Sequence, residues 1–175
     1  VAEANRFLVE NIIPDFISLS DLRFILTSLI REKISIKDIV YIFEKINDFA
    51  EDSSKSDLLK KIRLSLSRQI CKKNANQDGI ITAIEMSEKT LDKFNPNFDE
   101  SDDAIIRIDA DFAEKLAEKL KQKIKQLDIE NPKLFVPMEF RHLIFTLLSN
   151  YMNDITVLAR EEVGCNAQIE ILTEI

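Results

Sequence analysis

The sequence predicts a mixed α+β protein, with a mostly helical first part followed by a small α/β part. Glycine and proline are scarce, at 2 and 4 of 175 residues, which favours ordered helical structure. Apolar residues repeat at helical spacing through the first 75 residues, and short β-type runs appear only after residue 78. We therefore expect two domains, residues 1–77 and 78–175.

The first domain is expected to contain a short helix and three longer ones, each with one apolar face. Serine side chains precede two of the apolar stripes and are suitable N-caps. We expect helices over residues 2–12, from a cap at Ser18 or Ser20 to about Ile30, from a cap at Ser35 to about Ala50, and over residues 57–73.

The second domain shows strand-like runs that alternate with helical patterns, which implies some parallel strand pairing. Expected strands cover residues 80–84, 104–108, 134–136, 155–160 and 168–173. Expected helices cover residues 87–94, a stretch capped by Asp109 that runs to Leu127, and a stretch that Pro137 opens as its first helical residue.

Composition excludes several functional classes. The two glycines lie 85 positions apart, so no glycine-rich phosphate loop can form. One histidine and two distant cysteines, Cys71 and Cys165, cannot build a structural zinc site and fit a reducing compartment. The longest run without a charge or histidine, Leu143–Asn153, is too short for a membrane span. Because the chain opens on Val1 directly in a helical pattern, we interpret it as a piece of a longer protein.

Charge is unevenly distributed between the two domains. Residues 1–77 hold 13 basic and 11 acidic side chains, whereas residues 78–175 hold 11 basic and 20 acidic ones. The acidic second domain would repel a phosphate backbone, so nucleic acid is not an expected partner. Its charge indicates either a basic partner or a solvated acidic surface.

One stretch matches the spacing of an EF-hand calcium loop. Asn74, Asn76 and Asp78 occupy positions 1, 3 and 5, Ile80 would offer its carbonyl at position 7, and Glu85 would close the loop at position 12. Only two of these ligands are carboxylates, and no second loop is visible. The alternative interpretation is a polar connector between the domains, and we expect no metal or other cofactor.

Other chemical candidates have structural explanations. His142 fits a structural histidine beside an apolar helix face, because no nucleophile is identifiable near it. Asp109 and Asp111 fit the positive end of a helix better than a catalytic acid pair. Cys71 fits a small core residue. The sequence therefore does not predict an enzyme.

Three segments resemble the type III secretion export-gate family. The strongest resemblance is Leu19–Ile46, in which a helix, a charged turn and the motif Ile34-Ser-Ile-Lys-Asp38 lead into a second helix. Upstream, Leu8–Pro14 resembles the family's Leu-Val-x-x-Val-Pro entry into this region. Downstream, Leu59–Ile70 resembles a family helix with two arginines, here Arg63 and Arg68. The order of elements after residue 78 also agrees.

The resemblance implies a non-enzymatic role in bacterial protein secretion. Family members lie in the inner membrane through an N-terminal segment, and their cytoplasmic parts form a nonameric ring that receives chaperones, export substrates and ATPase-complex proteins. The two domains correspond to the third and fourth cytoplasmic subdomains, the third being implied in ring contacts. We expect Arg31, Lys37 and Asp38 as subunit-contact candidates, although they could equally be solvated helix ends. A virulence-type injectisome is favoured over a flagellar system. A calcium-binding protein or a helical adaptor is the alternative.

Overall fold

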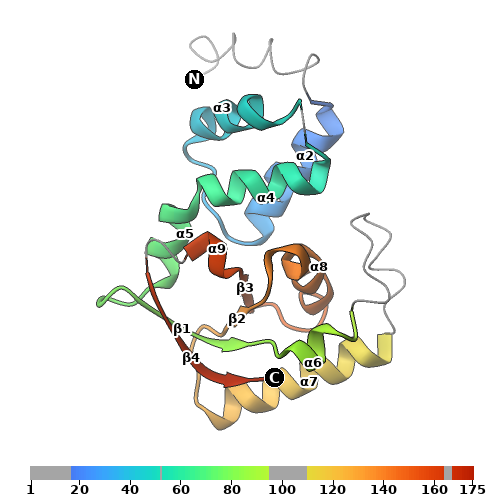
Figure 1. The fold of residues 1–175 in the computed structure, drawn as a ribbon, viewed down its shortest axis with the longest axis vertical. Helices are drawn as coiled ribbons and strands as arrows, with labels where there is room; N and C mark the ends of the chain where they lie inside the picture. The colour runs from blue at the N-terminus through green and yellow to red at the C-terminus, as the bar shows by residue number, and fades with distance from the viewer. Residues whose placement is uncertain (1–16, 52, 95–109, 164–166) are drawn as a thin grey trace. The chain divides into compact units, whose positions relative to one another are not determined.

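The computed structural model describes residues 17–51, 53–94, 110–163 and 167–175. The chain divides into two compact units, unit 1 up to Ile70 and unit 2 from Cys71 onward (Figure 1). Unit 1 is helical, and unit 2 contains a sheet with helices, so the fold class is the expected mixture. The domain boundary expected between residues 77 and 78 stays a prediction.

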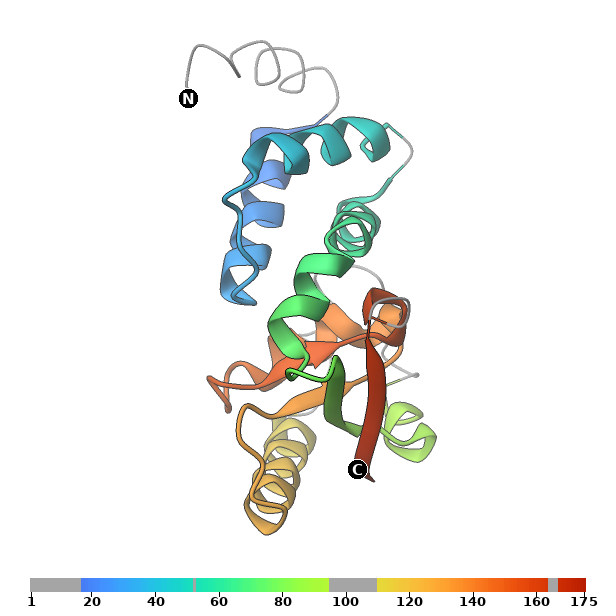
Figure 2. The ribbon, with the colours of Figure 1, turned by 90° about the vertical axis from the view of Figure 1, so that its left-hand side faces the viewer.

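Unit 1 is built from amphipathic helices whose apolar stripes meet in one core. The helices are α2 (Leu19–Arg31), α3 (Ile39–Phe49) and α4 (Lys55–Ser65), followed by α5 (Ser67–Asn74), which begins in this unit. Both α2 and α3 contact α4, and Figure 2 shows these helices from a second direction. The most deeply buried apolar side chains come from all three long helices: Ile25, Leu29, Ile42, Ile46, Leu59 and Ile62. The expected helix over residues 2–12 lies outside the described residues.

Side-chain caps fix where these helices begin. Ser18 caps α2, as expected, because its Oγ accepts a hydrogen bond from the Asp21 amide at 3.1 Å. The expected cap at Ser35 is wrong. Asp38 caps α3 by accepting from the Tyr41 amide at 3.3 Å, while Ser35 Oγ accepts from the Lys37 amide in a local turn. Such a local bond competes with helix formation, so α3 starts three residues later than a Ser35 cap implies.

The single helix expected over residues 57–73 is also wrong, because it is divided at Leu66 into α4 and α5. Leu66 has φ −91° and ψ 8°, outside helical geometry, and its side chain is buried. Tyr41 Oη donates to the Ser65 carbonyl oxygen at 3.2 Å. A carbonyl engaged by a side chain in this way is drawn out of the helical ladder, which explains a break at this position.

Unit 2 is a four-stranded parallel sheet with helices in the connections. After α5 come β1 (Ile80–Glu85), α6 (Glu88–Leu91), α7 (Ala110–Gln126), β2 (Lys133–Phe135), α8 (Met138–Leu148), β3 (Thr156–Leu158), α9 (Arg160–Val163) and β4 (Gln168–Glu174). The strand order is β3-β2-β1-β4, and every neighbouring pair is parallel. Figure 1 shows β1 and β4 side by side, although they lie far apart in the sequence. The expected parallel pairing is confirmed.

The main core of unit 2 lies between one sheet face and two helices. Ile84, Leu134 and Val157 are register neighbours on the three strands β1, β2 and β3, and all are buried. Side chains from α7 and α8 pack against this row. Parallel sheets need such a cover because both of their faces are apolar.

Three details of unit 2 differ from the expectation. Residues 160–163 form the short helix α9 instead of continuing a strand into a polar loop. Pro137 is the N-cap of α8, with φ −59° and ψ 147°, and not its first helical residue. The expected strand over residues 104–108 and the Asp109 cap lie outside the described residues.

Candidate binding surfaces

The charged turn between α2 and α3 is a well-formed helix end. The Ile34 amide donates to the Leu29 carbonyl and the Lys33 amide to the Ile30 carbonyl, both at 2.8 Å. This is a Schellman motif, with Lys33 in the left-handed region at φ 58°. Ile34 is buried directly after the turn. The turn is therefore fixed in place, with Arg31 and Lys33 exposed and the Glu32 side chain only 5% exposed.

The three contact candidates lie on this turn or beside it. Arg31, Lys37 and Asp38 are all exposed. Asp38 also has a structural task, since its carboxylate caps α3. A substitution at Asp38 would thus change helix stability as well as surface charge, whereas Arg31 and Lys37 are better probes of a contact. The structure describes one chain, so the contact role stays a prediction.

The two arginines of the family-like helix have different environments. Arg63 on α4 is 1% exposed and its Nη1 lies 2.7 Å from Glu32 Oε2, whose side chain is 5% exposed. Arg68 on α5 is exposed. Arg63 is therefore part of the core of unit 1, where it fixes the end of α2 against α4. Its place in the family-like pattern is explained by folding and not by recognition.

The EF-hand-like stretch does not bring its ligands together. Asn76 Oδ1 accepts from the Asp78 and Ile80 amides at 3.0 and 2.9 Å, so it serves the turn. An EF-hand continues into a helix that returns position 12 to the ion, but Ile80–Glu85 here is the extended strand β1. At about 3.3 Å per residue, Glu85 lies roughly 16 Å beyond Ile80. Glu85 is instead bonded to Arg160, so the stretch lacks the geometry of an EF-hand loop.

A cavity lies at the carboxyl edge of the sheet in unit 2. Its volume is about 680 Å³, within the range of ligand pockets. Its lining comes from the ends of β1, β2 and β4, the segments that follow β1 and β2, and the start of α9: Glu85, Met86, Ser87, Glu88, Lys89, Leu91, Phe135, Val136, Pro137, Arg160, Glu161 and Glu174. We call this feature the carboxyl-edge cavity. The lining includes both apolar and charged side chains.

Hydrogen bonds hold the rim of the carboxyl-edge cavity in place. Arg160 Nη2 and Nε donate to Glu85 Oε1 at 2.7 and 3.0 Å, and the guanidinium carbon lies 5.9 Å from the centre of the Phe135 ring. On the other side, Ser87 and Thr90 hydroxyls donate to the Ile175 carbonyl oxygen at 2.7 and 2.9 Å. These bonds tie the ends of β1 and β4 and the start of α6 together. The cavity is therefore largely pre-formed.

This cavity was not among the sites predicted from the sequence. The sequence held one indication of it, since charged residues lie at or just after the ends of three expected strands: Glu85, Arg160 and Glu174. Carboxyl ends of parallel strands meet at one sheet edge, so charges at several strand ends converge. The order of the strands in the sheet decides which of these charges lie next to one another, and that order could not be predicted from the sequence.

Among the described residues, the candidates for catalysis come from different helices: Cys71 from α5, Asp111 from α7 and His142 from α8. Cys71 is buried, and its Sγ donates to the Val163 carbonyl oxygen at 3.4 Å, as expected for a core residue. His142 is partly buried on α8. Within the described ranges, no three His, Cys, Asp or Glu side chains are grouped so that they could hold a metal ion. None of the helices in those ranges is long and apolar enough to cross a membrane.

Solved structures of export-gate cytoplasmic domains share this fold. The Shigella flexneri MxiA protein has a TM-score of 0.83 and 23% identity, covering 99% of this chain and 57% of that one. A nonameric SctV-C structure from EPEC has a TM-score of 0.84 and 18% identity, covering 99% and 53%. The structure of Chlamydia pneumoniae CdsV with the CdsO protein has a TM-score of 0.82 and 22% identity, covering 98% and 50%.

Sequence comparison identifies the family directly. The FHIPEP family profile matches residues 1–168, and the chain belongs to this family. It is 25% identical to the flagellar biosynthesis protein FlhA of Bacillus subtilis over 172 residues, covering 96% of this chain and 25% of FlhA. It is 33% identical to FlhA of Caulobacter vibrioides over 86 residues, covering 49% and 12%. The chain thus spans about a quarter or less of the curated relatives it matches.

The resemblance to the export-gate family is therefore confirmed. The relatives of this chain are components of flagellar and type III secretion export gates, and cytoplasmic domains with its fold are known in oligomeric form. The expected preference for an injectisome stays a prediction, because the curated relatives are flagellar and the similar solved structures come from secretion systems.

Proposed function

We propose that this chain is a non-catalytic part of an export gate whose cytoplasmic region assembles into a ring, as a nonamer, at the bacterial inner membrane. The observation that carries the proposal is the match of one fold over 99% of the chain to a nonameric SctV cytoplasmic domain, together with the family match over residues 1–168. Unit 1 supplies subunit contacts through the exposed charges Arg31, Lys37 and Asp38.

Unit 2 is proposed to receive protein partners. The related Chlamydia CdsV forms a complex with CdsO, which supports protein binding by members of this family. Secretion chaperones, export substrates and ATPase-complex proteins are the expected partner classes for this chain. The acidic composition of residues 78–175 favours partners that present basic surfaces.

Assembly is tested on the complete cytoplasmic region of the parent protein, by mass photometry over a range of concentrations. We expect particles of a single large oligomer, whose population falls when the two basic candidates are reversed in the variant Arg31→Glu/Lys37→Glu. The contact would then lose two charge pairs on each subunit. A particle mass that stays monomeric at every concentration would contradict the ring.

A matched control separates a contact effect from a general change in charge. Lys119 and Lys121 are exposed on α7 in unit 2, and Lys119→Glu/Lys121→Glu changes the net charge by the same amount. This control should assemble as the wild type does. Equal loss of oligomer in both double variants would show that Arg31 and Lys37 are not specific contact residues. It would not contradict the proposal that the wild-type protein forms a ring.

A further inference from the structure

The strand order of unit 2 creates a switch point between β1 and β4. From β1 the chain crosses to β2 and then to β3 on one side, and afterwards returns to the opposite side of β1 to add β4. In open parallel sheets, ligands bind outside the carboxyl ends of the strands where the order reverses. At this sheet the reversal lies between the ends of β1 and β4, which reach Glu85 and Glu174.

The carboxyl-edge cavity lies at this switch point. Both Glu85 and Glu174 are among its lining residues, and Met86 and Ser87 continue the rim after β1. Its apolar lining, which includes Met86, Leu91, Val136 and Pro137, suits the aliphatic stem of a long side chain. The topology and the cavity are separate observations, and they indicate the same position for a ligand.

The charged side chains around the cavity favour a positively charged ligand. Four carboxylates and two basic side chains line it. Glu85 and Arg160 are paired with one another at 2.7 Å. Among the described residues, the other three acids, Glu88, Glu161 and Glu174, have no ion-pair partner and are exposed. Lys89 is the other basic side chain of the lining, so three acids remain against one base and the cavity keeps an excess of negative charge for a group from outside.

The contacts of Arg160 show how a guanidinium group can be held at this cavity. Its guanidinium lies over the Phe135 ring and donates twice to Glu85. A planar cation is thus held by an aromatic face and a carboxylate. The remaining carboxylates can hold an incoming arginine or lysine in a similar way.

We propose that the carboxyl-edge cavity binds a basic amphipathic segment of a protein partner, with an arginine or lysine side chain inserted at the switch point between β1 and β4. The inference deepens the proposed function, because it rests on unit 2 receiving protein partners. The inference assigns partner binding to the carboxyl-edge cavity and specifies that the bound segment is basic and amphipathic.

The test uses residues 1–175 and a fluorescent arginine-containing amphipathic peptide, with binding measured by anisotropy at several salt concentrations. We expect Glu161→Gln/Glu174→Gln to weaken binding roughly fivefold through the loss of two charge pairs. The control Glu114→Gln/Glu118→Gln removes two exposed acids of α7 outside the cavity and should leave affinity within about twofold. A peptide with citrulline in place of arginine keeps the shape without the charge and should bind more weakly.

Several outcomes would overturn the proposal. Equal weakening in both double variants would mean a diffuse attraction between opposite net charges. Equal binding of the citrulline peptide would show that the positive charge is not needed for binding. Equally tight binding of spermidine would show that the cavity takes any polycation and does not select a protein segment. The amide chemical shifts of residues 86–91, 135 and 136 should move if the cavity is occupied. These readouts need no ring, so a failed assembly test and a failed peptide test are distinguishable.

Discussion

Two arginines in one stretch of unit 1 have different roles, one in the core and one on the surface. Arg63 and Arg68 look equivalent in the sequence, because both match the same family-like helix. In the structure Arg63 lies in the core with Glu32, and Arg68 is exposed. Glu32 lies 31 residues away from Arg63. Helical periodicity places each side chain on its own helix but does not pair residues across helices, so this contact could not be predicted from the sequence.

The Arg63–Glu32 pair gives a sharp stability test. Arg63→Met should lower the free energy of unfolding by about 3–5 kcal/mol, because it leaves a buried carboxylate without its charged partner. Arg68→Met, at an exposed position, should change it by less than about 0.5 kcal/mol. The double variant Arg63→Met/Glu32→Leu should recover part of the loss. Urea denaturation measures all three, and equal effects of the two arginine substitutions would contradict the buried pair.

A second residue-scale test concerns Asp128 after α7. The Ile129 amide donates to the Ile124 carbonyl at 3.0 Å, which makes Asp128 the left-handed residue of a Schellman motif, at φ 49°. Asp128→Gly should therefore stabilise the protein by about 1 kcal/mol, because glycine adopts this conformation without strain and the carboxylate leaves the negative helix end. Lys119→Gly within α7 should destabilise by about 1 kcal/mol. A less stable Asp128→Gly variant in thermal unfolding would refute this reading of the turn.

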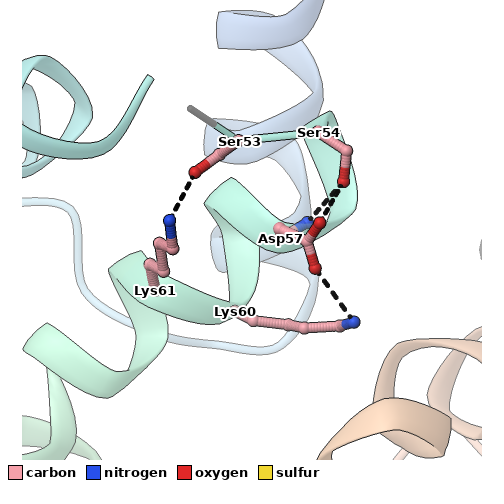
Figure 3. Close-up of polar contacts among 5 residues, drawn as sticks. All are labelled: Ser53, Ser54, Asp57, Lys60 and Lys61. Carbon is pink, nitrogen blue, oxygen red and sulfur yellow. Dashed lines mark hydrogen bonds and ion pairs between the residues drawn. The ribbon is translucent and has the colours of Figure 1, made fainter. Parts of the chain in front are cut away.

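At the scale of elements, the helix starts of unit 1 combine capping with charge. Figure 3 shows Ser54 at the start of α4, where its Oγ accepts from the Asp57 amide at 3.2 Å and donates to Asp57 Oδ2 at 2.6 Å. Lys60 Nζ lies 3.2 Å from the other carboxylate oxygen, and Lys61 bonds to Ser53. The Ser54 hydroxyl is the main cause that lowers the pKa of the Asp57 carboxyl below its ordinary value, and Lys60 adds to it.

This arrangement predicts a definite pH dependence for α4. A carboxyl whose pKa is lower in the folded than in the unfolded chain stabilises the fold above the unfolded pKa of 3.8. The contribution is lost as the pH falls through the folded pKa. An NMR titration of the Asp57 carboxyl should therefore give a midpoint below 3.8 in the wild type, shifted upward in Ser54→Ala. An unchanged midpoint in Ser54→Ala would assign the pKa shift to a different cause.

Elements were predictable to different degrees, for physical reasons. Long amphipathic helices such as α2 and α7 appear clearly in the sequence, because their apolar stripes run over three or more turns. The break at Leu66 does not appear, since it depends on the tertiary hydrogen bond from Tyr41. The helix α9 has only four residues, which is shorter than any periodicity can define. The carboxyl-edge cavity needs the order of strands, and that order arises from contacts distant in the sequence.

At the scale of the whole molecule, each unit has enough buried apolar surface for its own core. The core of unit 1 comes from α2, α3 and α4, and that of unit 2 from the sheet with α7 and α8. Differential scanning calorimetry of the chain should therefore resolve two unfolding transitions. A fragment of residues 67–175, which keeps α5 whole, should give dispersed amide spectra and the second transition alone. A single transition in the chain, with an unfolded fragment, would show that the units form one cooperative structure.

The position of β1 at the centre of the sheet has a consequence for synthesis. Its two partners, β2 and β4, follow it by about 50 and 90 residues in the chain. Unit 1 has all its helices before β1 is made, so it can fold while the ribosome is still translating unit 2. The apolar strand β1 must wait until Gln168–Glu174 has left the ribosomal tunnel before both of its edges are paired. In that interval the nascent chain exposes an apolar strand with unpaired edges, which makes unit 2 the part of this chain on which a chaperone would act during translation.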